Sequence, residues 1–193
     1  MKQKSAVCKR IESCITSYNQ SDYESCLINL FPIIDSTAKK RRPSLGVGKR
    51  MRAFISDELS IITIIGMSAT FVGGMFGSYS IPQVVYKLGR NSLIHDGSLD
   101  ERLSISEDGS FTLSDDKFIL PKAFIMGMML AVISAKENKN EKLDRGDILI
   151  EICGKDININ DLWGNREFVL FAIRQRFGDS FHDGELAPYS SFA

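Results

Sequence analysis

The sequence has few of the residues from which metal sites and disulfide frameworks are built. It contains four cysteines and two histidines among 193 residues. Cys8, Cys14, Cys26 and Cys153 have neither paired spacing nor a nearby histidine, which argues against both a zinc site and a disulfide framework. We therefore expect reduced thiols in the core of a cytoplasmic protein, with no metal and no cofactor.

The chain also lacks a net charge, because 24 lysines and arginines balance 24 aspartates and glutamates. This balance excludes a global basic field as a reason to bind nucleic acid, but it leaves room for a local one. Residues 35–52 carry seven basic residues against one acid, whereas residues 96–116 carry seven acids against Arg102 alone. The basic residues of the first segment are Lys39, Lys40, Arg41, Arg42, Lys49, Arg50 and Arg52.

Signals for export or membrane insertion are weak. The N-terminus lacks the continuous apolar run and the small-residue cleavage site of a signal peptide, so we expect no secretion. Residues 59–86 contain no charged residue and exceed the roughly 20 residues that span a bilayer. However, hydroxyl side chains within residues 60–70, followed by Gly73, Gly74 and Gly77, favour a buried helix and a tight loop. We expect no membrane partner.

Composition and length are those of a soluble globular domain. Hydrophobic residues make up 44% and charged residues 25%, far from the charge-rich composition of disordered chains. A chain of 193 residues can bury a substantial core. We predict one domain over residues 1–177 and a loosely ordered tail over residues 178–193, where no periodicity is present.

Apolar residues recur at spacings of three and four along much of the chain, which predicts amphipathic helices. Capping residues and prolines place their ends. The expected helices cover residues 4–19, residues 21 to the basic run before Pro43, about 49–65, 82–97, 121–133, and a last helix capped by Asn160 or Asp161. Pro32 lies inside the second helix and is expected to kink it, because it removes a backbone donor.

Two short segments alternate apolar and polar residues around turn sequences. Residues 102–114 alternate on either side of Asp108-Gly109, which predicts a two-stranded hairpin. Residues 148–152 and 157–159 flank Gly154-Lys155-Asp156 as a second possible hairpin. The predicted fold class is therefore mainly α, a helical bundle with one or two small β-hairpins.

The end of the fourth predicted helix brings together three polar residues that suit phosphodiester cleavage in RNA: Arg90, Asn91 and His95. An imidazole with a pKa near 6.5 can take the proton of an attacking 2′-hydroxyl or protonate the leaving oxygen. Arginine keeps its charge and matches the oxygens of a phosphoryl group, and an asparagine amide can orient either partner. Helix-terminal capping is the structural alternative, because cations are favourable at a helix C-terminus.

The sequence Arg90-Asn91 followed by His95, at the end of a helix in a helical chain, resembles the Arg-x4-6-His motif of the HEPN superfamily. Members of this superfamily are helical bundles, commonly dimers, and many are metal-independent endoribonucleases of toxin, abortive-infection or defence systems. Their motifs from two protomers meet at the dimer interface. The resemblance implies a homodimer in which Arg90, Asn91 and His95 are catalytic.

Two features depart from the superfamily pattern. Gly97 stands where HEPN toxins paired with nucleotidyltransferase antitoxins often carry a tyrosine, so regulation by modification of that tyrosine is not supported. The charge-free stretch and the hairpin after Gly97 exceed a minimal HEPN bundle, which leaves the substrate open.

We therefore expect a metal-independent endoribonuclease of a toxin or defence type, whose products end in a 2′,3′-cyclic phosphate and a 5′-hydroxyl. RNA is the expected partner, steered by the seven basic residues between positions 39 and 52, and an antitoxin or other protein partner is possible. The alternative is a non-catalytic HEPN-like module that binds RNA, a nucleotide or a protein. A third interpretation is a structural protein in which Arg90 and His95 make bonds between subunits.

Overall fold

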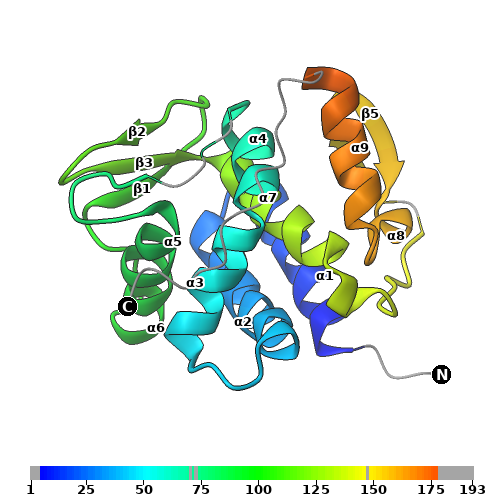
Figure 1. Ribbon diagram of the computed structural model, residues 1–193, viewed down its shortest axis with the longest axis horizontal. Helices are drawn as coiled ribbons and strands as arrows, with labels where there is room; N and C mark the ends of the chain where they lie inside the picture. The colour runs from blue at the N-terminus through cyan, green and yellow to red at the C-terminus, as the bar shows by residue number, and fades with distance from the viewer. Residues whose placement is uncertain (1–4, 70, 72–73, 147, 178–193) are drawn as a thin grey trace.

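A computed structural model describes residues 5–69, 71, 74–146 and 148–177 (Figure 1). Helices dominate these residues, and two small sheets accompany them, as the sequence predicts. Figure 1 shows the three-stranded sheet and the α9 helix on opposite sides of the molecule, with α4 and α7 between them. The predicted tail over residues 178–193 lies outside the described residues.

The chain opens with two helices that pack against each other, α1 (Ala6–Asn19) and α2 (Tyr23–Arg41). The cap of α2 is Asp22, whose carboxylate accepts a hydrogen bond from the Ser25 amide at 3.0 Å. The helix begins at Tyr23 and not at the predicted residue 21, because the backbone of Ser21 is left-handed with φ 58° and lies outside the helix. The helix continues through Pro32 to the basic run.

The predicted third helix is two helices, α3 (Val47–Asp57) and α4 (Leu59–Met67). The break falls at Glu58, whose backbone angles of φ −101° and ψ 9° leave the helical range. Apolar residues continue at helical spacing across this position, so local pattern alone does not reveal the break. The apolar side chains at helical spacing along the two helices are all buried: Met51, Phe54, Ile55, Leu59 and Ile62.

The charge-free stretch is not one helix either. Its helix α4 has nine residues, fewer than half of the roughly 20 that span a bilayer. Among the residues that the structure describes, no helix is both long and apolar enough to cross a membrane.

The fourth predicted helix is present, but its centre is a π-helix. A short α5 (Ile81–Gln83) leads into η1 (Val84–Asn91), and α6 (Ser92–His95) completes the segment. The Gln83 side chain accepts a hydrogen bond from the Ser80 amide, which caps the start. Gly97, with φ 82°, follows the end as predicted. The expectation of regular α-helical spacing is wrong between residues 84 and 91, where the turns are wider.

Three strands form the first sheet: β1 (Leu103–Ser106), β2 (Thr112–Leu113) and β3 (Phe118–Pro121), in the order β1-β3-β2. The predicted pairing of the two strands around Asp108-Gly109 is wrong. Instead, β3 lies between them, parallel to β1 and antiparallel to β2. Burial explains this order, because Phe118 and Leu120 are both buried and their strand takes the central position.

Helix α7 (Lys122–Ser134) follows with Pro121 at its N-cap, as predicted, and the 3-10 turn η2 (Lys136–Asn138) comes next. Glycine lets α4 and α7 approach closely. A Cβ atom on Gly127 would lie 2.5 Å from the carbonyl oxygen of Ile62, and one on Gly66 would lie 2.8 Å from Cα of Phe124. Backbone therefore packs on backbone at this crossing, in the centre of the core.

The second hairpin is confirmed, with β4 (Leu149–Ile152) antiparallel to β5 (Lys155–Asn158). Its turn is Cys153-Gly154, where both residues have positive φ. The predicted last helix is wrong in its extent. A four-residue α8 (Ile159–Leu162), capped by Asn158, precedes the separate helix α9 (Arg166–Phe177).

Candidate functional site

The three motif residues lie at the solvent-facing end of the η1–α6 segment. Arg90 and Asn91 are the last two residues of η1, and Arg90 Nη1 donates a hydrogen bond to Asn91 Oδ1 at 3.0 Å. His95 is the last residue of α6, and its side chain is exposed. Within the described residues, neither Arg90 nor His95 has an ion pair with a carboxylate.

A second arginine joins Arg90 at the ring of Tyr86. The Cζ atom of Arg90 lies 5.9 Å from the centroid of the Tyr86 ring, and Cζ of Arg52, on α3, lies 5.7 Å from the same centroid. Gly48 allows this arrangement, since a Cβ atom there would lie 3.0 Å from Cζ and Oη of Tyr86. We call Arg52, Tyr86, Arg90 and Asn91 the Tyr86 cluster.

Four of the seven basic residues predicted to steer RNA contact acidic residues of the same chain. Arg50 forms two parallel hydrogen bonds with Asp35, at 2.6 and 2.8 Å, and Arg42 binds Asp57 in the same way. These pairs reduce the attraction that the basic segment exerts on an anion. The other two residues with acidic partners are Lys40 and Arg41.

Three basic residues of the segment have no such partner among the described residues. Lys39 and Lys49 are exposed, and Arg52 packs on Tyr86. Lys49 and Arg52 are three residues apart on α3, so they are neighbours on its surface. Of these three residues, Arg52 lies beside the motif, because it packs on the same ring as Arg90.

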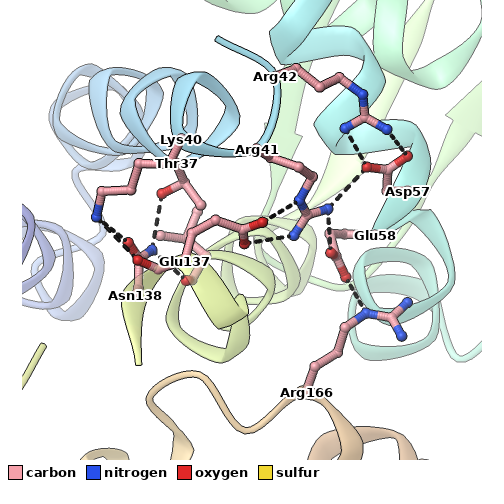
Figure 2. Close-up of polar contacts among 10 residues, drawn as sticks. Thr37, Lys40, Arg41, Arg42, Asp57, Glu58, Glu137, Asn138 and Arg166 are labelled. Carbon is pink, nitrogen blue, oxygen red and sulfur yellow. Dashed lines mark hydrogen bonds and ion pairs between the residues drawn. The ribbon is translucent and has the colours of Figure 1, made fainter. Parts of the chain in front are cut away.

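Arg41 forms the centre of a second polar group, which the sequence does not predict (Figure 2). Its guanidinium binds both oxygens of Glu137, at 2.9 and 3.0 Å, and also donates to Asp57 at 3.0 Å and Glu58 at 2.8 Å. The second oxygen of Glu58 accepts a hydrogen bond from Arg166 Nε at 2.8 Å. We call these five residues the Arg41 cluster.

Opposite charges hold the ionised forms of this cluster in place. Burial alone would lower the pKa of Arg41, but the bonds to Glu137 and the charges of Glu58 and Asp57 outweigh it, so the pKa is raised. Burial would likewise raise the pKa of Glu137, but the bond and charge of Arg41, a backbone hydrogen bond and the charge of Lys136 together outweigh it, so the pKa is lowered. Both groups are charged at neutral pH.

A cleft of about 560 Å³ lies beside the Arg41 cluster. Its lining residues are Arg41, Asp57, Glu58, Lys136, Gly164, Asn165, Arg166 and Glu167. The hydrogen bonds within the cluster already use both oxygens of Glu58 and all three nitrogens of Arg41. The cluster therefore joins α2, the α3–α4 junction, η2 and α9 to one another, and it offers few open groups to a ligand.

The sequence contains one signal for the Arg41 cluster. Glu58 interrupts an apolar face at helical spacing, and a carboxylate on a buried face needs a cationic partner. The partner itself, Arg41, lies in the basic run and is not distinguishable from its neighbours there. Within the described residues, no group of three metal-ligating side chains lies close enough together to hold a metal ion.

Comparison with known proteins gives a family. The model of the Rv1289 family matches residues 6–180. The chain belongs to the Rv1289 family. Similar relatives include the uncharacterized proteins Rv1289 and MT1327 of Mycobacterium tuberculosis and Mb1320 of Mycobacterium bovis. Each is 27% identical over 150 residues, which cover 67% of this chain and 71% of the relative. No solved structure matches the chain.

The Rv1289 family match includes both clusters, and the two differ in what they can do chemically. The Arg41 cluster is closed, because cations and carboxylates satisfy one another. The Tyr86 cluster holds two guanidinium groups against an aromatic ring, with no carboxylate partner in the described part of the chain. In this member of the Rv1289 family, the Tyr86 cluster with His95 is the better candidate for binding an anion.

Proposed function

We propose that the protein is a metal-independent endoribonuclease of a toxin or defence type, and that it cleaves RNA at Arg90, Asn91 and His95. One observation carries the proposal: among the described residues, Arg90 is held by Asn91 and Tyr86 rather than by a carboxylate, and an exposed His95 follows five residues later at the end of α6. The resemblance of this segment to the HEPN motif supports it.

The chemistry needs only groups that this segment carries. His95 takes the proton from a ribose 2′-hydroxyl as its oxygen attacks the adjacent phosphorus. The charge of Arg90 stabilises the negative oxygens of the phosphorane, and Asn91 orients the guanidinium through their hydrogen bond. The bond from phosphorus to the 5′-oxygen then breaks, and that oxygen takes up a proton. The products carry a 2′,3′-cyclic phosphate and a 5′-hydroxyl.

A homodimer belongs to the same proposal, since HEPN motifs from two protomers share one cleft. Ile94, beside His95, has 46% of its surface exposed, and Ile28 of α2 has 40%. Exposed apolar side chains of this size suit a protein contact. One imidazole cannot act as the base and as the acid in the same step. A second His95, from a partner subunit, would protonate the leaving 5′-oxygen.

Cleavage assays in excess EDTA test the proposal. We expect wild type to cleave a labelled RNA, and the Arg90→Ala and His95→Ala variants to cleave it at least about 100-fold more slowly. Arg10→Gln is the matched control, because Arg10 is an exposed arginine on α1, outside the η1–α6 segment. Equal cleavage by wild type and both motif variants would remove the motif from the mechanism.

A second candidate function is RNA binding without cleavage, and one observation favours it. Among the described residues, His95 has no hydrogen-bond partner that would fix the orientation of its ring, as catalytic imidazoles generally require. This candidate predicts that wild type binds RNA with no turnover, and that Arg90→Ala loses the binding.

A further inference from the structure

Arg52 carries a buried donor that no group among the described residues satisfies. Its Nε atom is buried and lacks a hydrogen-bond partner in the described part of the chain. An unsatisfied buried donor costs about 1–3 kcal/mol, and buried polar groups in native proteins are rarely left in this state. Arg50, two residues earlier, shows the usual solution, since its Nε and Nη2 both bind Asp35.

Among the residues that the structure describes, Arg52 has an aromatic ring and a second cation beside it and no acidic partner. Helix α3 has no acidic residue in its first turn, and its one carboxylate, Asp57, binds Arg41 and Arg42. The π-helix η1 carries Lys87 and Arg90 and no acid. Two guanidinium groups therefore share Tyr86 without a neutralising carboxylate from the described residues, although like charges repel at short range.

We propose that Arg52 is a second RNA-binding residue, which contacts the phosphate backbone together with Arg90 while Tyr86 positions both side chains. A phosphodiester supplies what the cluster lacks, because its oxygens accept hydrogen bonds and its charge offsets the two cations. This inference rests on the proposed action on RNA. Of the seven basic residues expected to steer RNA, it selects Arg52 and gives it a defined role, a phosphate contact made together with Arg90.

Binding of an RNA that resists cleavage tests this role. The probe is a fluorescent oligoribonucleotide with 2′-O-methyl riboses, which has no attacking hydroxyl, and affinity is measured by anisotropy over a series of salt concentrations. We expect Arg52→Gln to bind about tenfold more weakly than wild type. The slope of log affinity against log salt concentration should also be smaller, by the contribution of about one phosphate contact. Arg10→Gln removes the same charge from α1 and should bind like wild type.

Tyr86 is tested in the same assay. Tyr86→Phe keeps the ring and should retain affinity, whereas Tyr86→Leu should lose about as much as Arg52→Gln. Thermal melting establishes that each variant is folded. If Arg52→Gln does not fold, Arg52→Lys replaces it. Lysine keeps the charge but lacks the planar guanidinium that binds two phosphate oxygens, so weaker binding by this variant supports the proposal.

Unchanged affinity in the folded Arg52 variant would overturn the inference, and so would a wild type that binds inorganic phosphate but not the RNA probe. The outcome separates this inference from the endoribonuclease proposal. If RNA binding depends on Arg52 but no cleavage is seen, the role of Arg52 stands and the endoribonuclease proposal fails. If cleavage needs Arg90 and His95 but RNA binding does not depend on Arg52, the endoribonuclease proposal stands and the role of Arg52 fails.

Discussion

Arginine has two contrasting environments in this protein. The guanidinium of Arg41 makes four hydrogen bonds to three carboxylates and packs over the ring of Phe54 at 4.7 Å. Arg52 and Arg90 instead share an aromatic ring and lack an acidic partner among the described residues. The first environment stabilises the fold, and the second leaves positive charge available to a ligand.

Glu58 is the single residue on which the Arg41 cluster most depends. Its side chain is 1% exposed and lies between Arg41 and Arg166. We expect Glu58→Gln to lower the free energy of unfolding by about 3 kcal/mol, because it leaves buried cations without a charged partner. Urea denaturation measures the change.

Glu167→Gln provides the control for this substitution. Glu167 also lines the cleft, but it is exposed, so its loss should change stability by less than about 1 kcal/mol. Equal changes in the free energy of unfolding for the two substitutions would show that the buried Arg41 cluster does not contribute to stability.

Among the structural elements, those defined by local pattern are predictable from the sequence, and those defined by distant contacts are not. The periodicity of α1, α2 and α7 and the turn of the second hairpin place these elements within a few residues. The break at Glu58 is set by cations from α2 and α9, and the position of β3 is set by burial of Phe118. Neither cause lies within the local sequence.

The candidate site divides in the same way. Chemistry and spacing within one segment lead to Arg90, Asn91 and His95, and their role as a site stays a prediction. Arg52 is included among the predicted basic residues, but its contact with Tyr86 crosses from α3 to η1. The acidic partners that neutralise Arg41, Arg42 and Arg50 lie at least 15 residues from them along the chain, and no local pattern in the sequence marks them as partners of these arginines.

The crossing of α4 and α7 gives a prediction at the level of elements. Alanine favours a helix over glycine by about 1 kcal/mol, yet we expect Gly127→Ala to destabilise the protein by about 1–3 kcal/mol. The added methyl group would meet the Ile62 carbonyl oxygen at 2.5 Å, and backbone cannot move aside as a side chain can. Thermal melting measures the loss.

Gly146→Ala is the comparison, because no atom lies within 4 Å of a Cβ atom at that position. A melting temperature for Gly127→Ala at or above that of wild type would contradict the close packing of α4 on α7.

For the molecule as a whole, the Arg41 cluster predicts loss of stability in acid. The pKa of Glu137 is lowered in the folded protein from an ordinary value of 4.5, so the unfolded chain binds this proton at higher pH. The stabilisation is complete above about pH 4.5 and is lost as the pH falls through the lower, folded pKa. Urea denaturation across this range should show a smaller pH dependence for Glu137→Gln than for wild type.

The proposed activity of the η1–α6 segment is cleavage of RNA through the 2′-hydroxyl of the substrate. The most direct measurement compares cleavage, in excess EDTA, of one labelled RNA and of the same sequence with a single 2′-deoxyribose at the mapped cleavage position. We expect wild type to cut the first RNA at that position and to leave the second intact there, and we expect His95→Ala to cut neither. Cleavage of both substrates, or the same rate in His95→Ala, would contradict it.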